Sequence, residues 1–174
     1  MRTEIAGILA PAAANRETLR ELHAVIQTAM GWQDYHLHLF EIDGVRCGDV
    51  EDLDGPLGDE ETYTVCEAAA TATEFSYDYD FGDGWSHEIR VEPAAGTSGP
   101  QLIDGARACP PEDCGGPWGY QDLLEVLAEP THEEYHQLLE WLDGPFDPES
   151  FDLAETNAHL QLYDRHSRRR IGAR

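Results

Sequence analysis

Histidines and cysteines are the side chains whose spacing in this sequence first suggests chemistry. His36 and His38 alternate along one predicted strand, so both side chains lie on the same face. His87 shares the apolar face of a later strand, and four residues separate Cys109 from Cys114. Imidazole and thiolate groups bind zinc, so His36, His87, Cys109 and Cys114 are a candidate site for zinc or another divalent metal.

The metal pattern is incomplete. No second closely spaced cysteine pair and no histidine pair completes a tetrahedral set with these residues, so a full set of ligands cannot be read from spacing alone. A histidine on an apolar strand face is also typical of a hydrogen-bonded core residue. The sequence favours this core role and leaves the metal site as the alternative.

Carboxylates gather around one glycine turn. The segment Asp78-Tyr-Asp-Phe-Gly-Asp-Gly84 places its third acid and its glycine one position too late for an EF-hand calcium loop, so its glycines favour a turn. Asp80, Asp83, Glu112 and Asp113 could still line a cleft, with His87 as a general base and the carboxylates holding a divalent ion. The chain has no P-loop, dinucleotide fingerprint or Gly-x-Ser-x-Gly elbow. No catalytic set is complete.

Aromatic residues lie in or beside the same irregular segments. In such positions they can anchor a protein partner, while an acidic rim selects a basic one. They can equally fix a loop to the core. Because no catalytic set is complete, the sequence favours a binding module over an enzyme. The candidate binding residues are Trp32, His36, Asp80, Asp83, Trp85, His87, Glu112 and Trp118.

The chain is strongly acidic, with 35 acidic residues against 11 arginines and no lysine. This charge fits genome composition or a salty cytoplasm, an acidic surface for a basic partner, or mimicry of nucleic acid. Five arginines lie in residues 165–174, which we expect to form a disordered tail. The body, residues 1–164, is not expected to bind duplex DNA, because phosphate contacts need a basic patch.

The remaining composition points to the cytoplasm. No apolar run approaches the length of a membrane span, so no membrane partner is expected. Four cysteines without a dense framework indicate reduced thiols.

Hydrophobic periodicity predicts a single α+β domain with an antiparallel sheet. The predicted helices cover residues 18–30, 118–128, 131–142 and 152–163, and the predicted strands cover residues 36–42, 74–81 and 85–92. Loops are expected over residues 49–61 and 94–101. The last two strands flank Gly82-Asp-Gly84 and predict a hairpin with a three-residue turn, in which His87 is buried beside Tyr79 and Ile89. Helix starts are predicted at Thr18 and Thr131, each followed by a glutamate three residues later.

Four segments together resemble the plasmid pRiA4b ORF-3-like family, over about residues 17–163. They are Met30-Gly-Trp-Gln-Asp-Tyr-His-Leu-His-Leu-Phe40, Tyr77-Asp-Tyr-Asp-Phe-Gly-Asp-Gly-Trp-Ser-His-Glu-Ile89, Ala108-Cys-Pro-Pro-Glu-Asp-Cys-Gly-Gly-Pro-Trp-Gly-Tyr120 and Phe146-Asp-Pro-Glu-Ser-Phe-Asp152. The resemblance implies an α/β roll-like fold and an association with mobile elements or plasmid genes, without an established activity.

The resemblance also raises an expectation about the N-terminus. Family members usually open with a strand that leads into a Pro-x-x-Trp-Arg-Arg stretch, whereas only residues 1–15 precede the first predicted helix here. We expect this opening strand to be truncated or absent. An uncovered sheet edge would then favour a homodimer through strand pairing.

Overall fold

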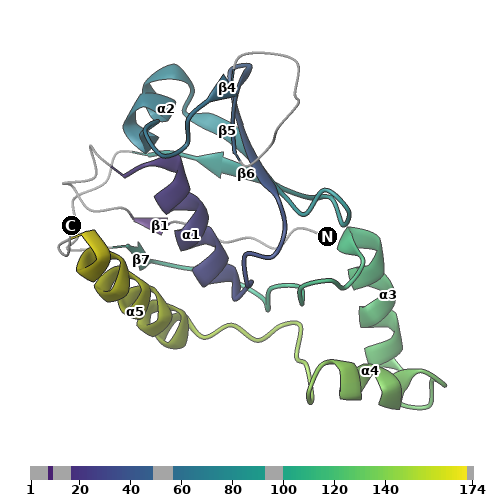
Figure 1. Cartoon of the computed structure of the whole chain (residues 1–174). Helices are drawn as coiled ribbons and strands as arrows, with labels where there is room; N and C mark the ends of the chain where they lie inside the picture. Colours follow the sequence, from purple (N-terminus) through teal and green to yellow (C-terminus); the bar gives the residue numbers. More distant parts are fainter. Residues whose placement is uncertain (1–7, 10–16, 49–56, 93–99, 172–174) are drawn as a thin grey trace.

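The computed structural model describes residues 8–9, 17–48, 57–92 and 100–171, with the backbone alone at residues 8–9 and 165–171. Its elements are β1 (Ile8–Leu9), α1 (Leu19–Met30), β2 (His38–Ile42), β3 (Val45–Gly48), β4 (Leu57–Gly58), α2 (Val65–Thr71), β5 (Glu74–Tyr79), β6 (Trp85–Arg90), β7 (Gln101–Leu102), α3 (Gly116–Ala128), α4 (Tyr135–Trp141) and α5 (Leu153–Ile171). Figure 1 shows α1 across one face of the sheet, with α5 beyond it. The predicted α+β class is confirmed.

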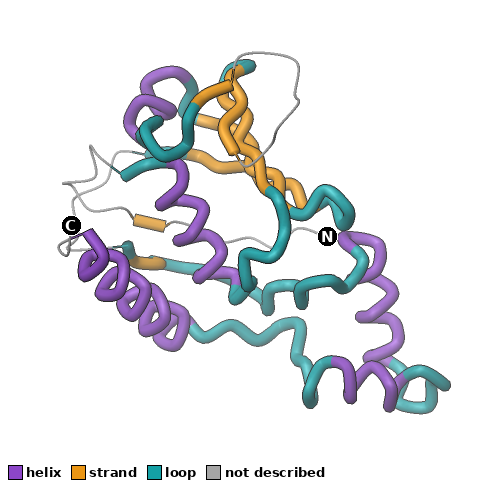
Figure 2. The backbone as a smooth tube through the Cα atoms, in the orientation of Figure 1, coloured by secondary structure: helices purple, strands orange, loops and turns teal. Residues whose placement is uncertain are grey.

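Five strands form the main sheet in the order β4-β3-β2-β5-β6. The sheet is mixed rather than purely antiparallel, because β4 pairs with β3 in parallel while the other neighbours are antiparallel. β1 and β7 form a separate antiparallel pair, seen as short orange segments to the left of α1 in Figure 2. β6 is an edge strand of the main sheet. The homodimer through such an edge stays a prediction.

Helix α1 forms where its caps predict. The Thr18 side chain accepts a hydrogen bond from Glu21 N–H, Glu21 caps in return, and Gly31 ends the helix with a left-handed φ of 74°. One face packs on the sheet, and the opposite face carries Val25 into a second cluster with Leu102 and Leu160. α1 is therefore covered on both sides, and several of its side chains are buried from solvent.

The predicted hairpin is confirmed, with two differences. The register places Tyr77 opposite His87 and Tyr79 opposite Trp85, so the alternation of the two strands is as expected. The turn, however, spans residues 80–84 rather than three residues. Asp80 ends β5, because it adopts a φ of 51° and its Oδ1 accepts N–H bonds from the next turn. Phe81 consequently leaves the strand and is exposed.

The C-terminal helices differ more from expectation. α4 begins at Tyr135, and the Thr131 hydroxyl donates to Glu129 instead of capping the helix. α3 buries Tyr120 and Leu123, whereas α4 has no buried residue. The two helices form an arm that projects from the body (Figure 1). α5 continues to Ile171, so the segment expected to be a disordered tail is helical through that residue.

Five elements were not predicted from the sequence, namely β1, β3, β4, β7 and α2. β2 and β3 form a hairpin through Asp43 and Gly44, whose φ angles of 48° and 81° match a two-residue turn. α2 begins at a second capping box, formed by Thr64 and Glu67. Residues 2–5 of the expected N-terminal strand, and most of the predicted loops over 49–61 and 94–101, lie outside the described residues. Among the helices that are described, none is both long and apolar enough to cross a membrane.

Candidate functional site

Three segments that are distant in sequence meet at one end of the sheet. We call this surface the loop end and define it as residues 31–37, 80–84 and 109–116. Trp32 Nε1 donates to the Pro110 carbonyl oxygen at 2.9 Å, and Gln33 N–H donates to Glu112 Oε2 at 2.8 Å. The Tyr79 hydroxyl donates to the other oxygen of Glu112. The first and third segments are therefore joined by both backbone and side-chain bonds.

The hairpin turn is fixed to the third segment. Gly115 N–H donates to Asp83 Oδ2 at 3.0 Å. A Cβ at Gly116 would overlap the carbonyl oxygen of Asp83, and Gly116 has a φ of 67°, so only glycine fits this contact without strain. The Asp83 side chain, a predicted binding residue, thus acts here as a structural group.

His36 lies between two carboxylates of the loop end. Its Nε2 is 2.9 Å from Asp113 Oδ1 and 3.6 Å from Asp80 Oδ2. The Asp80 side chain is 9% exposed, the His36 side chain 29% and the Asp113 side chain 64%. The group is therefore anchored in the protein on one side and reachable from solvent on the other. All three ligand-type atoms lie within 4.8 Å of one another.

A second polar group lies beneath α1, and its hydrogen bonds form a closed ring. Asp34 N–H donates to Gln27 Oε1 at 3.1 Å, and Gln27 Nε2 donates to the Tyr77 hydroxyl at 3.0 Å. That hydroxyl lies 2.8 Å from His23 Nδ1, and His23 Nε2 lies 2.7 Å from Asp34 Oδ1. Every partner is satisfied when Tyr77 donates to Nδ1 and Nε2–H donates to the carboxylate. The ring therefore specifies a neutral His23 with its proton on Nε2.

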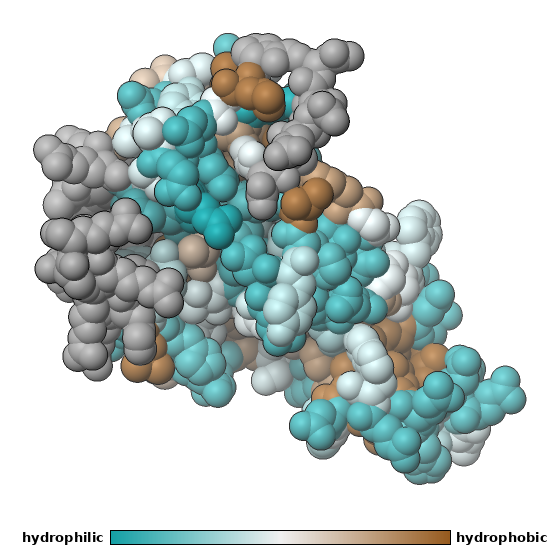
Figure 3. Space-filling view, viewed as in Figure 1, coloured by the Kyte–Doolittle hydropathy of each residue, from teal (hydrophilic) through white to brown (hydrophobic). Residues whose placement is uncertain are grey.

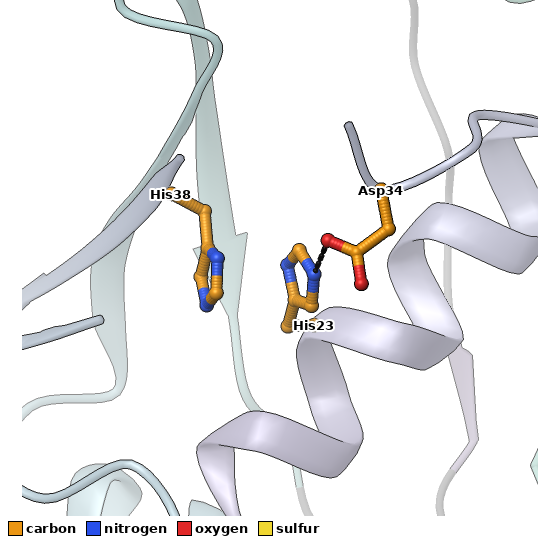
Figure 4. A group of neighbouring side chains, drawn as sticks. All are labelled: His23, Asp34 and His38. Carbon is orange, nitrogen blue, oxygen red and sulfur yellow. Dashed lines mark hydrogen bonds and ion pairs between the residues drawn. The ribbon is translucent and has the colours of Figure 1, made fainter. Parts of the chain in front are cut away.

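His38 stacks on His23, as Figure 4 shows for these two rings beside Asp34. The ring centroids are 3.6 Å apart and the planes differ by 15°. His38 Nε2 is 2.7 Å from Glu60 Oε2, and Arg20 lies 3.5 Å from Asp34 and 3.7 Å from Glu60. Two imidazoles are thus enclosed between two carboxylates, with one guanidinium at the rim.

Burial governs the charges in this second group. It lowers the pKa of His23 to about 4, with the neighbouring His38 adding to the effect against the opposing hydrogen bond of Asp34. Burial alone would raise the pKa of Glu60, but the hydrogen bond from His38 and the charges of His38 and Arg20 outweigh it and lower the pKa. His23 is therefore a neutral structural histidine near pH 7.

The ligand set predicted from sequence is not assembled. Among the described residues, the groups that could surround an ion contain His36 but neither His87 nor a cysteine. His87 Nδ1 lies 3.1 Å from the Tyr77 carbonyl oxygen, and burial lowers the pKa of the ring. The Cys109 thiol packs against Met30 Sδ at 3.6 Å. Burial raises the pKa of Cys109, and that of Cys114 to about 11, which disfavours the thiolates that zinc needs.

The predicted binding residues divide into three sets. Trp32 is buried, and Trp85 and His87 pack against it at ring distances of 5.9 and 5.6 Å. Trp118 is 81% exposed at the start of α3. His36, Asp80, Asp83 and Glu112 all belong to the loop end, where Asp80 joins His36 while Asp83 and Glu112 accept structural hydrogen bonds.

Sequence reasoning missed His23, Asp34 and the role of Asp113. A signal for His23 existed, because it follows Leu19 by four residues and precedes Ile26 by three, which places it on the buried stripe of the helix. A histidine at such a position needs buried partners. Asp113 had no comparable signal, since its neighbour His36 is 77 residues away in sequence.

Exposed apolar side chains surround the loop end and extend along the arm. We define the acidic arm as residues 116–144, which contain seven acidic residues and no lysine or arginine. Figure 3 shows brown apolar residues among teal ones over α3 and α4. The large exposed apolar residues of the loop end and the acidic arm are Tyr35, Leu37, Phe81, Trp118 and Trp141.

Known proteins with similar sequences and folds were found. The sequence model of a family described as "Plasmid pRiA4b ORF-3-like protein" matches residues 12–155. "Uncharacterized protein y4hQ" of Sinorhizobium fredii is 43% identical over 146 residues, which cover 80% of this chain and 75% of that protein. A crystal structure of "Protein of Unknown Function MM3350" from Methanosarcina mazei Go1 matches with a TM-score of 0.71 and 38% identity, over 80% of this chain and 83% of that one.

Proposed function

Because this chain belongs to the plasmid pRiA4b ORF-3-like protein family, whose description specifies no activity, we propose a function from its surface chemistry. The protein is a non-catalytic binding module that recognises a basic, amphipathic segment of a partner protein. The partner docks on the exposed apolar side chains of the loop end and the acidic arm. The plasmid reading frame in the family description supports a role among mobile-element genes.

The exposure of Trp118 carries this proposal. The side chain is 81% exposed at the point where the loop end meets the acidic arm, and Trp141 is 50% exposed on α4. Tryptophans that are solvent-exposed in the free protein and become buried on binding are typical energetic anchors of interfaces. A partner that covered Trp118 and Trp141 would also bury apolar surface that is exposed to solvent in the free protein.

The negative charge of the surface favours a partner segment of positive charge. The acidic arm has seven carboxylates without a single lysine or arginine, within a chain whose formal charge is -24. An acidic peptide or a nucleic-acid backbone would be repelled, whereas arginine can pair with carboxylates and also stack on tryptophan. The proposed partner is therefore a protein segment that combines arginine or lysine with apolar residues.

The test uses a fluorescent basic amphipathic peptide that carries arginine and leucine at helical spacing. Its control is the same peptide with every arginine replaced by glutamate. We expect saturable binding of the basic peptide alone, measured by fluorescence anisotropy, and weaker binding as salt screens the charges. Equal binding of the acidic peptide, or no binding of either, would contradict the proposal.

A pair of variants locates the surface. Trp118→Ala should lower the affinity for the basic peptide by roughly ten-fold or more, because anchor residues carry most of the binding energy. Leu57→Ala is the matched control, since Leu57 is 55% exposed on β4, away from the arm. Equal affinities for the two variants would place the peptide elsewhere and refute the assigned surface.

A further inference from the structure

We propose that His36, Asp80 and Asp113 form a binding site for one divalent transition-metal ion, independently of the peptide surface proposed above. The spacing of the three groups carries the inference. Ligand atoms bound to one ion at about 2.1 Å lie roughly 3.0–3.4 Å apart at octahedral or tetrahedral angles. His36 Nε2 lies 2.9 Å from Asp113 Oδ1 and 3.6 Å from Asp80 Oδ2, which brackets that range.

The buried carboxylate of Asp80 is held in the orientation that a ligand needs. Its Oδ1 accepts hydrogen bonds from Gly82 N–H at 3.0 Å and from Asp83 N–H at 3.2 Å. Its Oδ2 accepts no hydrogen bond within the described chain and faces His36, although the side chain is only 9% exposed. One oxygen is thus used to fix the group, and the other is free to coordinate an ion.

The local charge also favours a cation. Within the described residues, Asp80 and Asp113 form ion pairs with His36 alone, so one histidine faces two carboxylates. Glu112 and Asp83, from the same loops, add further negative charge nearby. A divalent ion would neutralise both carboxylates and leave His36 as a neutral ligand.

The second group that meets the distance criterion, His23 with Asp34 and His38, has the wrong directions. An imidazole nitrogen donates its lone pair in the plane of the ring. The rings of His23 and His38 are stacked at 3.6 Å with planes only 15° apart, so an ion in the plane of one ring lies well outside the plane of the other. Both nitrogens of His23 also have hydrogen-bond partners already.

The donor set narrows the choice of ion. One imidazole with two carboxylates suits manganese or zinc better than calcium, which prefers six to eight oxygen ligands. Asp113 is exposed and His36 partly exposed, so the remaining coordination positions face solvent. Water or a group from a bound partner would fill those positions.

The experiment measures metal uptake directly. Protein that has been stripped with a chelator is titrated with MnCl₂ or ZnSO₄ alone by isothermal titration calorimetry, without peptide. Mn²⁺-induced broadening of backbone amide resonances then locates the ion. We expect one saturable site per chain, with broadening centred on residues 36, 80 and 113.

Isosteric variants test the assignment without breaking the fold. Asp80 and Asp113 have φ angles of 51° and 58°, which asparagine also tolerates, and the amide oxygen of an asparagine at position 80 could still accept the turn N–H bonds. Asp113→Asn and Asp80→Asn should each lower the affinity for the metal ion by roughly ten-fold or more. Loss of a direct ligand costs at least as much affinity as loss of a residue that hydrogen-bonds to a ligand. Asp43→Asn is the matched control, because Asp43 has a φ of 48° in the distant β2–β3 turn.

Three results would overturn the proposal. The first is the absence of saturable binding, which would leave His36 as an ordinary ion-pair partner. The second is an equal loss of metal affinity in Asp43→Asn and Asp113→Asn. The third is loss of the ion in Asp34→Asn with retention in Asp113→Asn, which would place it at the His23 group. Each result is independent of the peptide assay, so the two proposals fail separately.

Discussion

Acidification should destabilise this protein through His23, and the size of the effect can be worked from its burial. The imidazole is completely buried, and its pKa in the folded chain is about 4, against an ordinary value of 6.5. Between these two values the unfolded chain binds a proton that the folded chain does not. The free energy of unfolding therefore has its full value above pH 6.5 and falls as the pH drops from 6.5 towards 4.

The magnitude follows from the two pKa values. Protonation of the unfolded state alone costs about 1.4 kcal/mol of stability at pH 5.5 and about 2.5 kcal/mol at pH 4.5, relative to pH 7.5. His87 acts in the same direction, because burial lowers its pKa as well. Glu60, whose pKa is lowered by His38 against the effect of burial, also loses stabilisation towards acid. The total loss in the native sequence should exceed the His23 contribution.

Urea unfolding followed by tryptophan fluorescence isolates the His23 contribution. The native chain and His23→Gln are compared at pH 7.5 and pH 4.5. The variant loses stability at both pH values because it breaks the ring of hydrogen bonds. Its change in unfolding free energy between the two pH values should nevertheless be smaller by about 2.5 kcal/mol, since glutamine does not titrate.

Two results would refute this reasoning. One is an equal pH dependence for the native chain and His23→Gln. The other is an NMR titration in which the His23 ring protonates near its ordinary pKa of 6.5, which would mean that burial and the stacked His38 do not keep it neutral against the opposing effect of Asp34.

Three further substitutions test contacts elsewhere, each by urea unfolding. Gly116→Ala should lower the free energy of unfolding by more than about 3 kcal/mol, because the added methyl group overlaps a backbone carbonyl. Gly84→Ala, which has open space at a φ of 72°, should lower it by about 1 kcal/mol. Similar losses for the two variants would refute the overlap. Thr64→Ala should cost about 1 kcal/mol by removing the cap of α2, and an unchanged stability would mean that the cap is dispensable. Asn157→Ala should cost about 2 kcal/mol, because it leaves the N–H and carbonyl of buried Leu102 unpaired, and a loss typical of an exposed site would contradict this.

Local patterns predicted the elements that depend on near neighbours. The Thr18 and Glu21 pair starts α1 as expected, and the alternation on both sides of the glycine turn forms the hairpin. Thr131 and Glu134 have the same spacing but no cap forms, because the Thr131 hydroxyl bonds Glu129. A capping-box sequence therefore allows a helix to begin there but does not ensure it. The conformation of the residues that precede the helix decides whether the cap forms.

The candidate sites depend on contacts that sequence spacing does not encode. His23 is satisfied by Tyr77, 54 residues away, and His36 meets Asp113 across 77 residues. The family resemblance directed attention to the right loops, and His36 and Asp80 do lie together there. It could not separate Asp113 from Glu112, because adjacent residues differ in direction only once the backbone is known. Glu112 turns to Tyr79, and Asp113 turns to His36.

The turn over residues 80–84 explains why the candidate metal site lies where it does. Asp80 leaves the strand in a left-handed conformation, so its Oδ1 can cap the following turn while Oδ2 faces away from it. The turn cannot move freely, because Asp83 receives the Gly115 N–H and its carbonyl packs against Gly116. The same two glycines carry the chain onward from Asp113. Packing at residues 83 and 116 therefore holds the backbones of the 80–84 turn and of the 109–116 segment together, so an ion would enter a site whose backbone is already supported by the fold.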